Sequence, residues 1–329
     1  MITLFTPFTP ETMKTSVVAA LGKRIIGQGK TVEEFEKRLS FLGTNVLTVN
    51  SGTSALEIAY DLLDLEPGDE VISSVFTFVG ANIPLVRRGV KVVFADVGDN
   101  LLVDWHDVRS KITSRTRAVI NTHLFGLYNK APYLPVPVIG DACQYLGKTK
   151  GELMTAYSFQ ATKIITTVDG GALVCAKKKD YNRAKLLRWF GADRKKVFGD
   201  IKEAGYKYHM NDVTASMGIA ALRHLIKLQT HRQKLIHIYK KVLGRTGGSP
   251  FLIYSSHRDK LQKLLLSHGF ETGLVHKRND LYSLFGGKRQ DLPTMNGIES
   301  TYLFLPCHYG MTVQDVERIC RLVKKYDYS

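Results

Sequence analysis

The sequence lacks the features that mark membrane, secreted and zinc-binding proteins. No stretch approaches the roughly 18 apolar residues that cross a bilayer. Residues 1–21 lack the basic start and apolar run of a secretory signal. Its 329 residues include four cysteines, none in a C-x-x-C pair, and no Cys/His cluster has zinc spacing. We therefore expect a cytoplasmic chain with reduced thiols, no membrane span and no metal site.

Acidic residues are also scarce, because 30 Asp and Glu stand against 46 Lys and Arg, which gives a net charge of +16. Such a field attracts polyanions, so nucleic acid and a phosphate-bearing small molecule are both candidate partners. The basic residues form short scattered runs, such as 177–179 and 324–325, which are more typical of a solvated surface. No nucleic-acid fold signature is present, so nucleic acid is the less favoured partner.

Seven apolar runs predict a sheet. They are rich in Val, Ile and Phe and do not alternate with polar residues, as is typical of strands buried on both faces. Helical stretches separate several of them, which favours a mostly parallel α/β sheet. The predicted strands are 46–49, 71–79, 91–96, 117–124, 136–139, 155–159 and 172–175.

A break at 244–250 predicts where a large domain ends and a smaller one begins. A long helical stretch over 212–243 precedes this break, and the pattern after it is mixed. We expect a large domain over 1–243 and a small α+β domain over 244–329. The elements expected in the small domain are strands 251–254 and 272–276 and helices 258–268 and 313–325.

The segment 31–34 has the spacing of a capping box, in which Thr31 caps a helix and Glu34 reaches back to it. Phe35 and Leu39 then mark one apolar face. The sequence therefore predicts that a short helix begins at Thr31.

Ser51, Gly52 and Thr53 lie between a predicted strand and a predicted helix. Small residues there allow backbone N–H groups and hydroxyls to hold an anion at the helix N-terminus. Serine or threonine also caps helices where no ligand binds, and this plainer interpretation stays open.

Asp141 and Lys163 follow two other predicted strands. A carboxylate at the end of strand 136–139 lies where parallel sheets bind ligands, although aspartate also caps helices. Lys163 follows the weakly charged stretch 158–162, where desolvation lowers the pKa of an amine and makes it nucleophilic toward carbonyls. A surface lysine is the alternative. Together with the anion site, these residues suit pyridoxal phosphate, which needs a phosphate site, an acid and a lysine.

Seven segments in the right order carry a family resemblance. Through them the chain resembles, over nearly its whole length, the DegT/DnrJ/EryC1/StrS family of sugar aminotransferases. This resemblance implies the type I pyridoxal-phosphate fold of aspartate aminotransferase, a mostly parallel sheet flanked by helices. The segments are 27–36, 50–56, 67–79, 123–126, 141–144, 158–163 and 305–312.

The resemblance implies a role for each candidate site residue. Lys163 would form a Schiff base with pyridoxal 5'-phosphate and shuttle a proton. Asp141 would pair with the ring nitrogen, Phe78 would stack on the ring, and Gln144 would bond its phenolic oxygen. Phe78 as plain core and Gln144 as a surface amide are the structural alternatives. The phosphate would be held by Ser51, Gly52, Thr53, Ser158 and, in the neighbouring subunit's site, Lys207.

The resemblance also implies the reaction and the partners. A lysine at 163 favours transamination, because relatives with histidine there are dehydratases. Glutamate or glutamine would donate the amino group to a nucleotide-linked keto-deoxysugar, and residues 210–221 slightly favour its C4. The enzyme would be a homodimer with shared active sites. The sugar nucleotide would meet His276, Lys277 and Arg278, with Arg278 suited to a diphosphate, although a solvated loop is the alternative.

Three features depart from the family pattern. Lys207 stands where an asparagine is usual, and Asp169 stands where a glutamate is common. Only 17 residues separate His123 from Asp141, and the prolines among them predict a loop where relatives have a helix. Two other functions therefore stay open. One is a type I pyridoxal-phosphate enzyme acting on small amino acids, and the other is a non-catalytic regulator that binds nucleic acid.

Overall fold

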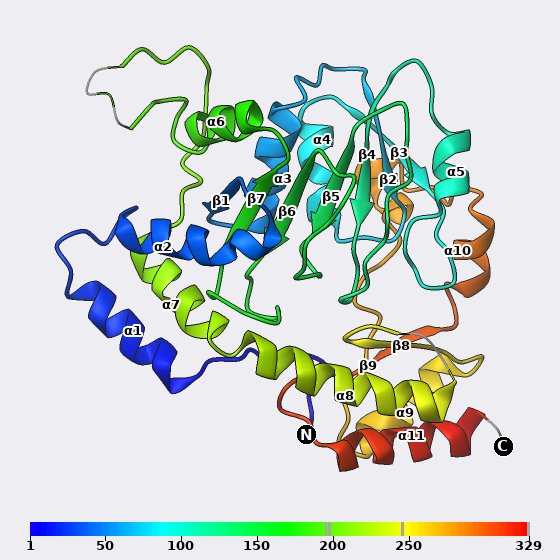
Figure 1. Cartoon of the computed structure of the whole chain (residues 1–329). Coiled ribbons are helices and arrows are strands. Elements are labelled where there is room, and N and C mark those ends of the chain that lie inside the picture. The colour runs from blue at the N-terminus through cyan, green and yellow to red at the C-terminus, as the bar shows by residue number, and fades with distance from the viewer. Residues whose placement is uncertain (195, 197–198, 245–246, 328–329) are drawn as a thin grey trace.

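The computed structural model describes residues 1–194, 196, 199–244 and 247–327. A seven-stranded sheet with the order β1-β7-β6-β5-β4-β2-β3 forms its centre (Figure 1). Strands β2 to β6 pair in parallel, whereas β7 runs antiparallel to both β6 and β1. This confirms the predicted mostly parallel α/β sheet. The strands are β1 (Val46–Val49), β2 (Glu70–Ser74), β3 (Lys91–Ala95), β4 (Thr116–Thr122), β5 (Val138–Ala142), β6 (Met154–Ser158) and β7 (Gly171–Cys175).

Helices cover both faces of this sheet because neighbouring strand residues point to opposite sides. On β6, Ala156 packs into the core beneath α3 (Gly52–Asp61), whereas Tyr157 packs into a second core with α2 (Lys30–Arg38) and α7 (Asp212–Leu222). The other helices of this part are α1 (Glu11–Leu21), η1 (Leu39–Leu42), η2 (Val79–Ala81), α4 (Ile83–Arg87), α5 (Trp105–Ser110) and α6 (Lys178–Leu187).

The remaining residues form a smaller part around a two-stranded sheet, in which β8 (Phe251–Tyr254) pairs antiparallel with β9 (Tyr302–Leu305). The long helix α8 (Leu225–Leu243) runs below the lower edge of the large sheet (Figure 1). Leu228 of α8 packs into the large part and Tyr239 into the small one. The boundary at 243/244 stays a prediction. The other helices are α9 (Arg258–Ser267), η3 (Asn279–Leu281), η4 (Ser283–Phe285), α10 (Pro293–Ile298) and α11 (Val313–Asp327).

The predicted capping box is wrong. Helix α2 begins at Lys30, and the carboxylate of Asp212, on α7, accepts hydrogen bonds from the N–H groups of Gly29 (2.8 Å) and Val32 (3.1 Å). Glu34 pairs with the next turn of its own helix instead of reaching back. A residue 180 positions away therefore caps this helix, so no local pattern could show it.

Two other expectations have different outcomes. The strand expected at 272–276 is wrong, because only Gly273 makes an isolated bridge, to Phe304 of β9. The loop expected before Asp141 is confirmed, since residues 123–137 connect β4 to β5 without a helix. Within the described ranges, no helix has the length and apolar character that a membrane span requires.

Candidate active site

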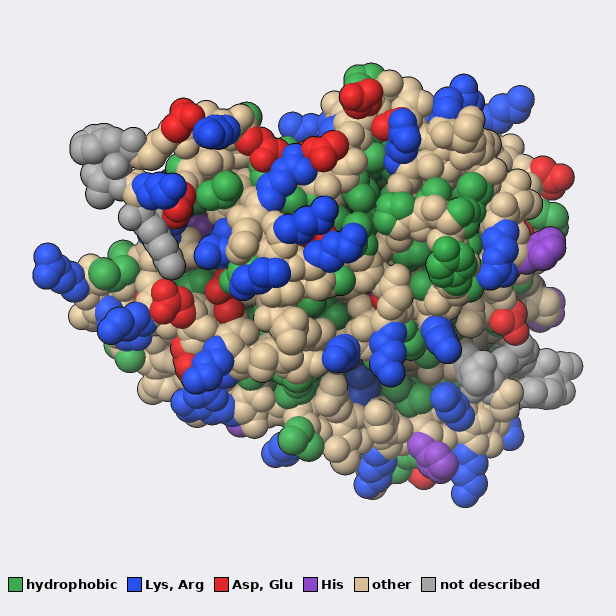
Figure 2. Space-filling model, turned by 45° about the horizontal axis from the view of Figure 1, so that its top comes forward, with side chains coloured by type: hydrophobic (Ala, Val, Ile, Leu, Met, Phe, Trp, Pro, Cys, Tyr) green, Lys and Arg blue, Asp and Glu red, His purple; other side chains and the backbone are tan. Residues whose placement is uncertain are grey.

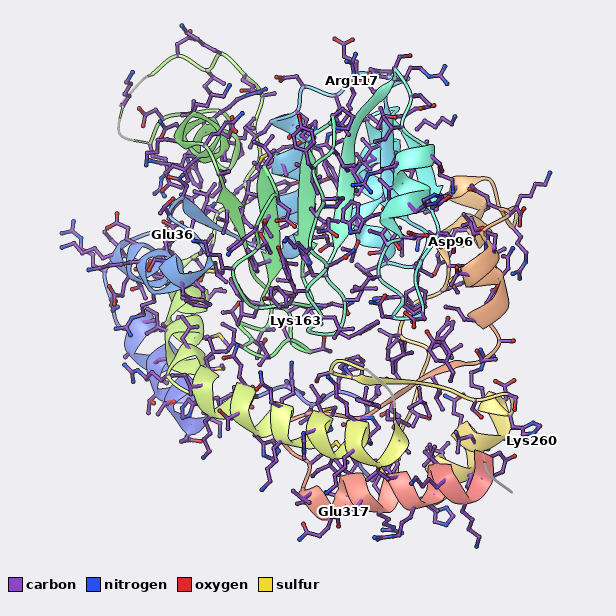
Figure 3. The ribbon with its side chains drawn as sticks, turned by 45° about the vertical axis from the view of Figure 1, so that its right-hand side comes forward. Glu36, Asp96, Arg117, Lys163, Lys260 and Glu317 are labelled. Carbon is purple, nitrogen blue, oxygen red and sulfur yellow. The ribbon has the colours of Figure 1, made fainter. Side chains whose placement is uncertain are left out.

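A cavity of about 1080 Å³ lies at the carboxyl ends of β4, β5 and β6. Its upper wall comes from the segments that follow these strands and from the N-terminus of α3, and α8 contributes the opposite wall. Figure 3 shows Lys163 at this lower edge of the sheet, on the side that faces α8. Open α/β sheets bind ligands at this edge, so the cavity is the candidate site.

Most of the residues predicted from the sequence meet in this cavity, and three do not. Those that line it are Ser51, Gly52, Thr53, Phe78, Asp141, Gln144, Ser158, Lys163 and His276. Those that do not line it are Lys207, Lys277 and Arg278.

Lys163 lies in a turn after β6, where its backbone N–H donates to the carbonyl of Gln160 at 2.9 Å. Burial lowers the pKa of the Lys163 amine, and the nearby Cys143 and Asp141 act in the opposite direction. Desolvation of this kind raises the fraction of neutral, nucleophilic amine. Lys163 is therefore a desolvated amine within electrostatic reach of Asp141, and not a free surface lysine.

Asp141 belongs to β5 itself and is 5% exposed. Its Oδ1 accepts the N–H of Cys143 at 3.1 Å. No helix lies between β5 and β6, so the helix-cap interpretation is wrong. No ion pair of Asp141 occurs within the described residues, although a buried carboxylate ordinarily has a cationic partner. The carboxylate is therefore available to a cationic group in the cavity.

The N-terminus of α3 forms the anion-binding end of this wall. Ser51 caps the helix, because its Oγ accepts the N–H of Ser54 at 3.0 Å. The first N–H groups of a helix have no partner within it and carry the positive end of its dipole. A Cβ at Gly52 would lie 2.6 Å from Cys143 Sγ and 2.9 Å from Ser158 Cβ, so only glycine allows this approach. The cap and the anion site therefore coexist.

Phe78 and Gln144 both line the cavity. Phe78 is 58% exposed, so the interpretation as plain core is wrong. Gln144 is not a surface amide either, because its Oε1 accepts the N–H of Phe125 at 3.3 Å and its Nε2 donates to His276 Nε2 at 2.7 Å.

Burial, together with the Lys163 charge, lowers the pKa of His276 to about 3. His276 is therefore neutral at ordinary pH, as its acceptor role requires.

Arg278 and Lys277 have other partners. Arg278 is fully buried and donates to Asp280 at 2.6 Å, to Asn296 at 2.6 Å and to Glu299 at 3.1 Å. The chain's own carboxylates neutralise its guanidinium, so we correct the expectation that it contacts a diphosphate. Lys277 places its Nζ 5.0 Å from the ring centre of Tyr282.

Lys207 lies between two anchored tyrosines. The rings of Tyr206 and Tyr208 stack at 4.3 Å, and their hydroxyls bond Arg88 and Glu57. These bonds fix the segment to its own chain while Lys207 stays outside the cavity. Its predicted contact with a neighbouring subunit's cofactor stays a prediction.

The wall formed by α8 was missed by the sequence analysis. Gln229, Arg232, Gln233, Ile236 and Lys240 all line the cavity. Residues 229, 232, 236 and 240 follow one another at three or four positions, with Gln233 beside Arg232, so they lie on one helix face. The inward face of a helix is ordinarily apolar. Glutamine, arginine and lysine on such a face therefore indicate a binding site, and this signal is present in the sequence.

Comparisons with known proteins place this chain among the aminotransferases. The model of the DegT/DnrJ/EryC1/StrS aminotransferase family matches residues 9–324, and the chain belongs to that family.

Particular relatives are similar over nearly the whole chain. GDP-perosamine synthase of Caulobacter vibrioides is 27% identical, with 94% of this chain and 91% of that protein covered. A UDP-4-amino-4,6-dideoxy-N-acetyl-beta-L-altrosamine transaminase of Campylobacter jejuni is 26% identical, with 92% and 91% covered. The crystal structure of the sugar aminotransferase CalS13 from Micromonospora echinospora is similar with a TM-score of 0.91 at 25% identity. The match covers 99% of this chain and 100% of that one.

Proposed function

We propose that this enzyme uses pyridoxal phosphate to move an amino group from glutamate to a nucleotide-linked keto-deoxysugar. The observation that carries the proposal is the meeting of Lys163, Asp141 and the N-terminus of α3 in one cavity. The family supports transamination of sugars. The name of the Campylobacter relative specifies a 4-amino sugar, which supports amination at C4.

The residues present fit this cofactor. The helix N-terminus at Gly52 and Thr53, with Ser158 beside it, suits a phosphate. The unpaired carboxylate of Asp141 suits a protonated ring nitrogen, and the exposed ring of Phe78 offers an aromatic face for stacking. When bound, the cofactor supplies an electron-withdrawing ring that stabilises negative charge on the substrate carbon.

The chain's own side chains supply nucleophilicity, charge and proton transfer. The desolvated amine of Lys163 would hold the cofactor, and its Nζ would be the base that carries the proton of the substrate carbon. Asp141 keeps its partner protonated, because a buried carboxylate favours the cationic form of a neighbour. Gln144, held by Phe125 and His276, presents a fixed amide beside the reacting groups.

The size of the cavity favours a large substrate over a small amino acid. A volume of about 1080 Å³ lies just above the roughly 300–1,000 Å³ that ligand pockets commonly measure. A nucleotide-linked sugar, bound beside the cofactor in its own half-reaction, would use this space, whereas a small amino acid does not require it.

A homodimer with shared sites accounts for the apolar side chains that the single chain leaves exposed. Ile25 is 60% exposed, and Val168, which precedes the cavity-lining Asp169, is 54% exposed. We propose that a second copy covers these two side chains and that Lys207 reaches the partner's phosphate as a point charge.

Figure 2 shows Lys and Arg spread over the visible face instead of gathered in one stripe, which favours a small anionic substrate over nucleic acid.

The test compares the wild type with Lys163→Ala. The wild type with pyridoxal phosphate should show an absorption band from cofactor joined to Lys163, and the variant should lack it and lose roughly 10⁴-fold in rate. Identical spectra for the two proteins would refute the role of Lys163.

Two further measurements separate the alternative functions. Amino transfer to simple keto acids but not to nucleotide keto-sugars would favour the enzyme acting on small amino acids. Tight, steeply salt-dependent DNA binding without cofactor would favour the non-catalytic regulator.

A further inference from the structure

Three enclosed arginines of this chain are paired with carboxylates at short distance. Pairing is the rule for buried charge, because a charge removed from water without a partner costs several kcal/mol. The pairs are Arg278 with Asp280 (2.6 Å), Arg188 with Glu36 (2.8 Å) and Arg88 with Asp61 (2.7 Å).

Arg232, on α8, differs from these arginines. It is only partly accessible to solvent, and it lines the main cavity. Burial lowers the pKa of its guanidinium, and the thiol of Cys307 acts in the opposite direction. Among the residues that the structure describes, its guanidinium forms no ion pair and no hydrogen bond. Since arginine stays charged in proteins, the cavity holds an uncompensated cation.

Within the described residues, no carboxylate forms an ion pair with Arg232, whereas neutral donors lie beside it. Gln229 and Gln233 lie on the same helix face and line the same cavity. On the facing side, Ser249 and His308 are occupied, because Ser249 Oγ donates to the carbonyl of Cys307 and His308 Nε2 bonds the carbonyl of Thr3 at 2.9 Å. Two amides and one guanidinium therefore point to an anionic ligand that the chain does not supply.

The position of Arg232 places such an anion opposite the reacting amine. Helix α8 runs below the sheet edge (Figure 1), and Lys163 faces it from that edge (Figure 3). Both residues line one cavity. A ligand held at Arg232 by one end can therefore extend toward Lys163 with the other.

We propose that Arg232 binds a carboxylate of the amino donor. This inference rests on the proposed function and names the donor's subsite within it. The planar guanidinium matches a carboxylate through two parallel hydrogen bonds. One enclosed positive charge balances one carboxylate, whereas a diphosphate would bring two negative charges. Lys240, farther along α8, is exposed and adds no enclosed charge.

The test separates the two half-reactions of the holoenzyme in an Arg232→Gln variant. The half-saturating concentration of L-glutamate should rise about 10- to 100-fold, because a charged hydrogen-bonding partner is lost. The half-reaction of the aminated enzyme with the nucleotide keto-sugar should stay within about twofold of the wild type. Arg232→Lys keeps the charge but not the planar guanidinium. Its half-saturating glutamate concentration should lie between those of the wild type and Arg232→Gln.

Lys234→Gln is the matched control, since it removes the same charge from an exposed position on α8 that does not line the cavity. It should leave both half-reactions unchanged. Calorimetric titration of the holoenzymes with glutarate supplies a readout that needs no turnover, and Arg232→Gln should weaken that binding by a similar factor.

Two outcomes for Arg232→Gln overturn the inference. Unchanged glutamate saturation and glutarate binding in Arg232→Gln would remove any donor role. A selective loss in the nucleotide-sugar half-reaction would assign the arginine to the diphosphate instead. An absent absorption band in the wild type would refute the proposed function itself and this inference with it, whereas a normal band limits the failure to Arg232.

Discussion

The region around Arg278 and the cavity around Lys163 differ in how the chain neutralises buried charge. Arg278 is enclosed by Asp280, Asn296 and Glu299, so its hydrogen bonds are satisfied internally. In the cavity, the carboxylate of Asp141 and the guanidinium of Arg232 line one space, and neither forms an ion pair within the described chain.

This difference separates structural charge from functional charge. A network that the chain completes stabilises the fold, and removal of one member leaves the others buried and unpaired. A charge that the chain leaves without a partner costs stability, and a bound ligand offsets that cost. The residue type alone does not distinguish the two cases, since the sequence places an arginine at both positions.

The largest expected effect concerns the complete network. Arg278→Gln should lower the free energy of unfolding by about 3–5 kcal/mol, because Asp280 and Glu299 lose their buried partner. Arg232→Gln should change the same quantity by less than about 1 kcal/mol, or raise it. Urea unfolding of both variants measures the comparison. Equal destabilisation would show that Arg232 has a structural partner and would break the contrast.

The second prediction concerns the carboxylate of the cavity. Asp141→Asn keeps the shape of the side chain and removes its charge, so the rate of the glutamate half-reaction should fall by about 10²-fold. Stability without cofactor should hold or increase, because an unpaired buried charge has been removed. Single-turnover kinetics and urea midpoints test the two parts. A stable variant with an unchanged rate would contradict the role of Asp141.

The smallest effect concerns His276. This side chain is buried as a neutral group, whereas Arg278 is buried as a paired charge and Arg232 lines the cavity as an unpaired one. Its folded pKa of about 3 lies below the unfolded value near 6.5, so the unfolded chain binds the proton first. The contribution of the neutral histidine to the free energy of unfolding is fully present above pH 6.5. It is lost as the pH falls toward 3.

Between pH 6.5 and 5, the free energy of unfolding of the wild type should therefore drop by roughly 1 to 2 kcal/mol more than that of His276→Gln. Urea midpoints at the two pH values, compared between the proteins, isolate this contribution from the carboxylates. Parallel slopes would mean that His276 titrates normally in the folded state.

The upper wall of the cavity could be predicted because its signals lie within short segments. Ser51 to Thr53 and Lys163 follow strands, Asp141 lies near the end of one, and the carboxyl ends of parallel strands meet at one edge. Fold class and most of the cofactor site follow from this rule and from the order of the motifs.

The other features depend on contacts between distant segments. The cap of α2 comes from Asp212, and the partners of Arg278 include Glu299, so neither is visible in a local pattern. Arg232 lines the cavity only because α8 packs beneath the sheet edge, together with residues near Ser249 and His308. Burial decides the role of each of these residues, and burial is a property of the folded chain.

The central claim is that the amine of Lys163 carries the cofactor, and covalent trapping tests it most directly. The holoenzyme is reduced with borohydride, which fixes a Schiff base as a stable amine, and is then digested and mapped by mass spectrometry. One pyridoxyl group is expected, on the peptide that contains Lys163. A pyridoxyl group on another lysine, or none on a protein that still transfers amino groups, would contradict it.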